Sequence, residues 1–187
     1  MIIKETLQEQ RNLPDDPLAF FKKVTGDVLH FLETDYEFKQ VSIEIDDTME
    51  WVPIIECRII YRNATTEITV RYDWYEDLRG TPELIIARLN QEPEGQAQPV
   101  EGYNIDLLIS ERCPNKIIKK QKYNSEEKIA DILQSYADVL KEHGRDVLTG
   151  DFRIFPILRT RLEKEIDNNK TVILNAADYN DDVDEAS

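Results

Sequence analysis

Three consecutive segments alternate apolar and polar residues with a period of two, and this pattern constrains the fold more than any other feature of the sequence. The segments are 41–46, 51–62 and 66–73. A period of two places successive side chains on opposite faces of a strand. We therefore expect Val41, Ile43 and Ile45 to share one face of the first strand and the opposite face to be exposed to solvent. The short turn at 63–65 favours an antiparallel meander.

Segments with the apolar spacing of amphipathic helices bracket these strands. The expected helices are 17–34, 125–143 and 155–167. Asp16 and Pro17 form a typical helix start, and Asn124 with Glu127 predicts a capping pair for the second helix, which Gly144 should end. The sequence therefore predicts the α+β class, with an antiparallel meander of three or four strands and the helices packed mainly on one face. It leaves the strand order open.

Four segments have weaker patterns. Residues 83–89 fit a strand or a helix, and we favour a fourth strand. Residues 90–102 are rich in Pro and Gly, which predicts a loop. Residues 103–110 fit a short apolar helix or a strand. The apolar residues 172–174 are expected to add an edge strand or to dock on the core.

Length and charge indicate the organisation of the chain. Its 187 residues fit one α+β domain over 1–175, with a loosely attached arm at 1–15 and an acidic, flexible tail at 176–187. The formal net charge is −15, from 23 Lys and Arg against 38 Asp and Glu. This charge disfavours direct binding to nucleic acids and to anionic membranes, and it favours a basic protein partner.

The sequence contains neither an apolar run of the roughly 20 residues that a membrane helix needs nor a secretion signal at its start. The two cysteines indicate no disulfide framework. We therefore expect a cytoplasmic protein that does not bind membranes.

The patterns typical of catalytic and cofactor sites are missing from the sequence. His30 and His143 lie in expected helices, and His143 fits a helix C-terminus better than a catalytic role. Cys57 falls on the apolar face of a strand, and Cys113 has no obvious activating neighbour. Neither the spacing of metal ligands nor a glycine-rich phosphate loop occurs. We expect no catalytic residue, no metal and no cofactor.

Two clusters of acidic and aromatic residues are the candidate partner-binding site. They comprise Glu44, Asp46, Asp47, Glu50 and Trp51, and Asp73, Trp74, Tyr75, Glu76 and Asp77. In an antiparallel meander both clusters would lie at the same end of the sheet. Aromatic anchors beside carboxylates suit a protein interface. The alternative is that the tryptophans belong to the core and that the acids are ordinary solvated strand ends.

The order of motifs resembles that of uncharacterised small acidic bacterial α+β proteins and, more loosely, of toxin-immunity proteins. The resemblance rests on an amphipathic helix, strands that end in Tyr72-Asp73-Trp74, a capped helix and the segment 143–152, and it covers most of 17–165. It implies a bacterial, non-enzymatic protein, and it assigns a role to no individual residue.

Together these observations predict a non-catalytic binding protein that neutralises or regulates a basic partner, with a toxin-immunity protein as the most concrete version. A carboxylate-dependent hydrolase and a structural adaptor that uses the acidic tail are the alternatives. The oligomeric state is left open.

Overall fold

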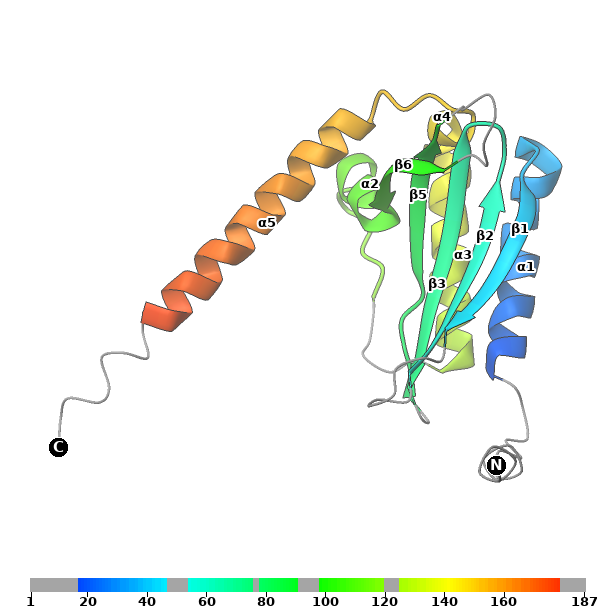
Figure 1. Ribbon diagram of the computed structural model, residues 1–187, viewed down its shortest axis with the longest axis horizontal. Coiled ribbons are helices and arrows are strands. Elements are labelled where there is room, and N and C mark those ends of the chain that lie inside the picture. The colour runs from blue at the N-terminus through cyan, green and yellow to red at the C-terminus, as the bar shows by residue number, and fades with distance from the viewer. Residues whose placement is uncertain (1–16, 47–53, 76–77, 91–97, 120–124, 179–187) are drawn as a thin grey trace, which may run out of the picture.

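The computed structural model describes residues 17–46, 54–75, 78–90, 98–119 and 125–178, and it confirms the α+β class (Figure 1). The expected arm at 1–15 and residues 179–187 of the expected tail lie outside this part of the chain. The elements are, in chain order, α1 (Pro17–Tyr36), β1 (Lys39–Asp46), β2 (Ile54–Arg62), β3 (Thr66–Tyr75), β4 (Leu78–Arg79), β5 (Glu83–Leu89), β6 (Pro99–Asn104), α2 (Ile105–Arg112), α3 (Glu126–His143), α4 (Arg145–Leu148) and α5 (Phe155–Asp178).

The strands form a meander in the order β1-β2-β3-β5-β6, and all neighbouring pairs are antiparallel. The short strand β4 pairs only with the end of β3. The antiparallel meander is confirmed, and so is the strand favoured for 83–89. The expected number of three or four strands is too low, because the path through described residues has five strands besides β4.

The additional strand, β6, lies where the sequence predicted a loop, so that prediction is wrong for residues 99–102. Pro99 begins the strand, a position that a proline tolerates because its missing N–H costs little there. Gly102 lies opposite Ala87, and a Cβ added to the glycine would come within 3.1 Å of the Ala87 Cβ. In this segment the proline begins an edge strand, and the glycine allows that strand to approach Ala87 of β5 closely. The segment expected as helix or strand divides, since Tyr103 belongs to β6 and Ile105 begins α2.

Helices α1 and α3 cover one face of the sheet, as Figure 1 shows, and the core lies between the two layers. Cys57, Ile59 and Tyr61 of β2 point into this core, which confirms the alternation expected for the second strand. Phe21 of α1 stacks on Tyr72 of β3 with ring centroids 4.7 Å apart. Burying each large apolar side chain contributes about 1.5–3 kcal/mol, so this layer contact is the main source of stability.

The N-terminus of α3 differs by one residue from the expected cap. Ser125 is the N-cap, and its hydroxyl accepts a hydrogen bond from the Lys128 N–H at 3.3 Å. Asn124 lies outside the described residues. At the other end, Gly144 is the C-cap, as predicted, and His143 lies in the last helical turn.

Helix α5 is longer than expected and includes 172–174, so the predicted edge strand at that position is wrong. Asparagine is a weak helix former but does not break a helix as proline does, and Asn168 and Asn169 are accommodated within α5. Phe155 and Leu158 in the first turns are buried. Beyond them the helix extends away from the sheet (Figure 1).

The turn between β2 and β3 is fixed from outside by α4. The Asn63 side-chain amide donates to the Leu148 carbonyl at 2.9 Å, and the Thr66 hydroxyl donates to the Val147 carbonyl at 2.8 Å. Gly150 follows α4 with φ +88°, and a Cβ there would lie 2.6 Å from the Thr65 hydroxyl. The segment 143–152, part of the resemblance described above, therefore has a packing role.

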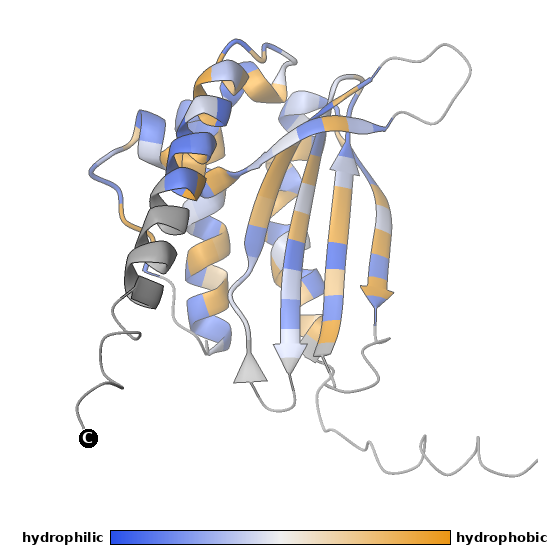
Figure 2. Ribbon diagram, turned by 60° about the vertical axis from the view of Figure 1, so that its left-hand side comes forward, coloured by the Kyte–Doolittle hydropathy of each residue, from blue (hydrophilic) through white to orange (hydrophobic). Residues whose placement is uncertain are grey.

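The first strand departs most clearly from its predicted environment. Val41, Ile43 and Ile45 were expected to share a buried face, yet their exposed fractions are 50%, 42% and 50%. The reason is topological, since β1 is the outermost strand and α1 packs over β2 and α3. Figure 2 shows β1 at the margin of the sheet, with hydrophobic positions along it.

Candidate functional site

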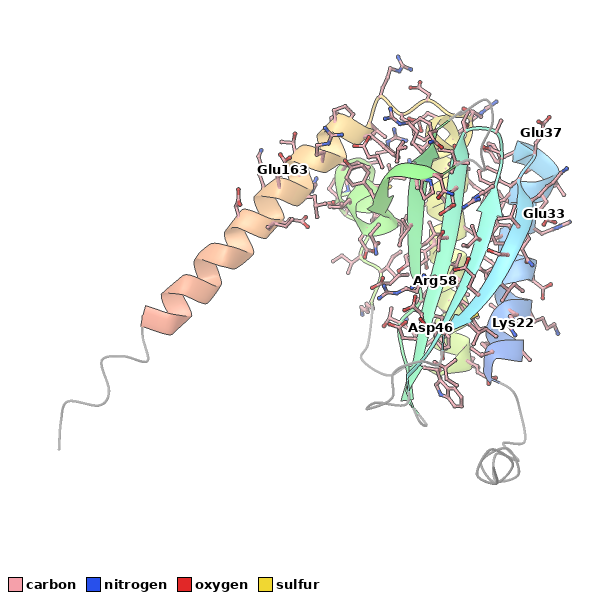
Figure 3. The ribbon with its side chains drawn as sticks, in the orientation of Figure 1. Lys22, Glu33, Glu37, Asp46, Arg58 and Glu163 are labelled. Atoms are coloured by element: carbon pink, nitrogen blue, oxygen red, sulfur yellow. The ribbon has the colours of Figure 1, made fainter. Side chains whose placement is uncertain are left out.

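None of the described helices lies over the face of the sheet opposite to α1 and α3 (Figure 1). Figure 3, in the same orientation, shows Asp46 of β1 and Arg58 of β2 on this face. The register of the strands arranges its charged residues in rows. Arg58 lies opposite Arg71, and the next row along the sheet contains Asp46, Glu56 and Asp73. We call these two rows the charged sheet face, together with Glu44 and Glu83, which flank the arginines.

The register brings together three of the predicted site residues. Asp46 and Asp73 lie in one row with Glu56 between them, and Glu44 lies opposite Arg58. The ends of β1 and β3 therefore meet at the same end of the sheet, as the antiparallel geometry predicted. This places the residues side by side and leaves their role in binding a prediction.

Trp74 is the one predicted aromatic anchor whose side chain is described, and it is not part of this arrangement. Trp74 is half-buried and packs against the core, so the alternative of a core tryptophan holds for it. Only the backbone of Tyr75 is described, as the last residue of β3. The remaining predicted site residues lie outside the described part of the chain: Asp47, Glu50, Trp51, Glu76 and Asp77.

Sequence reasoning missed the two arginines and the carboxylate between the aspartates. Arg58 donates to Glu56 and lies 3.9 Å from Glu44. Arg71 lies 3.5 Å from Asp73 and 3.7 Å from Glu83. The period of two in 51–62 implies that Glu56 and Arg58 lie on the face opposite to Cys57. A charge on a solvent-exposed face is too common to single out without knowledge of the neighbouring strand.

The electrostatics of this face follow from its pairing. Like charges directly opposite each other destabilise a sheet, so the Arg58–Arg71 neighbours require compensation. The hydrogen bond to Glu56 raises the pKa of Arg58, with smaller contributions from the charges of Glu44 and Asp46. The arginines are thus held among carboxylates, and acidic groups outnumber basic ones in these rows.

Beside the arginines the same face forms a hollow of about 490 Å³. Its lining combines apolar side chains, including Ile60, Ile85 and Val100, with charged ones. Glu67 is a buried carboxylate in this lining, 7% exposed, and it accepts hydrogen bonds from Arg62 at 2.7 Å and from the Thr69 hydroxyl at 3.0 Å. The lining therefore offers apolar surface beside carboxylates, which suits a partner segment that presents both aliphatic and basic side chains.

The residues considered for chemistry lie apart from this face. His30 is exposed on α1 beside Glu33, Cys57 is buried on the opposite face of the sheet, and Cys113 is half-buried after α2. Among the described residues, His, Cys, Asp and Glu side chains form no group of three that could hold a metal ion.

Comparison of the chain with protein-family models, with curated proteins and with solved structures finds no match. In the part of the chain that the structure describes, none of the helices has the length and apolar character needed to cross a bilayer.

Proposed function

We propose that this chain is a non-catalytic binding protein that neutralises or regulates a basic protein partner through the charged sheet face. The observation that carries the proposal is the uncovered face of the sheet, where five carboxylates surround Arg58 and Arg71 next to a hollow with apolar lining. An uncovered face with this composition offers both desolvated apolar contact and charge complementarity to a cationic segment.

The net charge of −15 supports the same choice of partner. The negative charge of the chain accelerates the encounter with a cationic protein through long-range attraction, and it disfavours anionic proteins through repulsion. Close to the surface, lysine or arginine side chains of the partner would compete with Arg58 and Arg71 for their carboxylates. Its aliphatic side chains would enter the hollow.

The most concrete version is a bacterial cytoplasmic immunity protein that occludes the active surface of a cationic toxin. This version rests on the resemblance of motifs described above. It can be tested by expressing the product of the adjacent reading frame with and without this chain, and growth rescued only by co-expression would support it.

The binding proposal can be tested with an array of extended peptides in which Lys or Arg alternates with Val or Ile, and with a matched array that carries Glu instead of the basic residues. We expect the basic peptides to bind and the acidic ones to be rejected. Replacing Asp46 and Asp73 by lysine should weaken binding roughly tenfold or more, since each removes a favourable charge and adds a repulsive one.

The matched control is the double variant Asp27→Lys and Glu142→Lys, which makes the same change in net charge on exposed positions of α1 and α3. We expect it to reduce binding much less than the variant of the sheet face. Equal losses in the two variants would mean that only the overall charge matters, and the assignment to the sheet face would then be wrong.

A further inference from the structure

The outer margin of β1 is a feature that the proposed function does not use. β1 pairs with β2 on one side, and no described residue pairs with it on the other. An edge strand that exposes aliphatic side chains is open to pairing with another strand, and natural proteins usually block such edges with charges, prolines or bulges. Here the register on the β2 side is irregular at Val41, between Gln40 and Ser42, and it is regular from Ser42 to Asp46.

Two of the exposed aliphatic residues of β1, Ile43 and Ile45, continue the buried face of the sheet. Ile43 lies opposite Ile59, and Ile45 lies opposite Cys57. Ile59 and Cys57 are buried beneath the helices, with exposed fractions of 1% and 0%. Because opposite residues in an antiparallel pair point to the same face, the apolar layer runs past the cover of the helices to the margin of the sheet.

The adjacent flank of α1 leaves this margin accessible. Glu33 lies on this flank, near Tyr61 of β2. Burial raises the pKa of Tyr61 to about 12, and the negative charge of Glu33 makes a smaller contribution to the same shift. Gly26 lies two turns before Glu33 on the same flank, and a Cβ added there would meet nothing within 4 Å. A glycine inside a helix costs about 1 kcal/mol relative to alanine, and no contact among the described residues explains it here.

We propose that two copies of the chain pair through this margin, with their β1 strands antiparallel about a two-fold axis at Ile43. The contact joins the two sheets into one and brings the exposed aliphatic residues of both copies together. It rests on β1 alone and is independent of the proposed function.

The register of this contact follows from the residues of β1. Centred on Ile43, the pairing places Ile43 opposite its own copy, Val41 opposite Ile45 and Ser42 opposite Glu44. All three aliphatic residues then have aliphatic partners, and the carboxylate faces a hydroxyl donor. The pattern of the strand is therefore complementary to itself.

The neighbouring symmetric registers are worse. Centring the pair on Ser42 would place Ile45 opposite the cationic Lys39. Centring it on Glu44 would bring two carboxylates face to face, which destabilises a sheet. A cationic partner would have no reason to choose this aliphatic margin over the charged sheet face, so a second copy is the occupant that the chemistry favours.

The first test is the mass of the full chain in solution, measured by sedimentation over a wide concentration range. We expect a species of twice the mass of the chain. Replacing Ile43 by lysine puts two cations opposite each other and should weaken association at least roughly tenfold. The control is Ile157→Lys on α5, whose exposed fraction of 48% is close to the 42% of Ile43. Circular dichroism establishes that both variants fold.

A chain that stays monomeric at every concentration, or equal weakening by the two lysine variants, would overturn the proposal. So would a chain lacking residues 1–15 that dimerises when the full chain does not, because the segment 1–15 would then be the occupant of this margin.

Cysteine cross-linking tests the register independently. In a Cys113→Ser background, Ile43→Cys should form an intermolecular disulfide with its own copy, because directly opposite residues have Cα atoms about 4.5–5.5 Å apart. Val41→Cys and Ile45→Cys should cross-link when the two variants are mixed, and neither should cross-link alone. Self-linking of either single variant, or no link through Ile43→Cys, would contradict the two-fold contact at Ile43.

Discussion

Two glycines of this chain differ in what a side chain would meet. At Gly150, with φ +88°, a Cβ would lie 2.6 Å from the Thr65 hydroxyl, whereas at Gly26 it would meet nothing within 4 Å. We expect Gly150→Ala to lower the free energy of unfolding by about 1–3 kcal/mol, because it combines a strained backbone with a clash. Gly26→Ala should raise it by about 0.5–1 kcal/mol, since alanine restricts the unfolded chain and favours the helix.

Urea denaturation of both variants beside the unaltered chain measures the two changes. The pair is its own control, because the same atoms are added in each case. A Gly150→Ala chain as stable as the original would show that α4 does not press on the turn between β2 and β3.

At the scale of the elements, an ion pair joins the end of α2 to α4. Arg112 donates to both carboxylate oxygens of Asp146, with one contact at 2.6 Å, and also donates to the His143 carbonyl. The hydrogen bonds from Arg112 hold the pKa of Asp146 below its ordinary value of 3.8. A lowered pKa stabilises the fold above the unfolded value, and this contribution is lost as the pH falls through the folded value.

Asp146→Asn should therefore destabilise the chain by about 1–3 kcal/mol at neutral pH, since a partly buried guanidinium loses its charged partner. The difference in free energy of unfolding between this variant and the original chain should shrink as the pH falls below 3.8. Denaturant titrations at several pH values measure it, with Asp27→Asn on the exposed face of α1 as the control for loss of one charge. A difference that stays constant with pH would argue against the ion pair.

Local patterns predicted the elements well where one period dominated the segment. The alternation predicted for 51–62 corresponds to β2 (Ile54–Arg62), and the capped amphipathic pattern of 125–143 corresponds to α3 (Glu126–His143). They failed where tertiary contacts decided the outcome. Gly102 fits β6 because of its close neighbour Ala87, and the aliphatic residues of β1 are exposed because none of the described helices covers that edge. Neither circumstance is visible within a window of a few residues.

The candidate site shows the same division. Asp46 and Asp73 could be placed together because, in an antiparallel meander, the ends of the first and third strands lie at the same end of the sheet. The Arg58–Arg71 pair could not be found, since it depends on the register between two strands. A single residue of slip would have moved every side chain to the other face.

For the whole molecule, the two proposed contacts should respond to salt in opposite directions. Two copies that each carry a net charge of −15 repel each other, so salt that shortens the screening length to roughly 10 Å or less should strengthen dimerisation. Binding of a basic peptide should weaken over the same range, because there the charges attract. Sedimentation and peptide titrations at low and high salt measure both trends. Parallel trends would mean that one of the two surfaces has been misassigned.

The two margins of the sheet are unlike, and this difference bears on uncontrolled growth. β1 has exposed aliphatic residues, whereas β6 begins with Pro99, contains Gly102 and is tied to α5 through the 2.6 Å contact between Glu101 and Arg159. A fibril that grows by strand addition needs subunits with two edge strands that are free to pair, because each added subunit must in turn pair with the next one. A molecule with a single receptive margin terminates propagation after one addition. The difference between the edges at β1 and β6 should therefore limit association of this protein to pairs and prevent fibril growth.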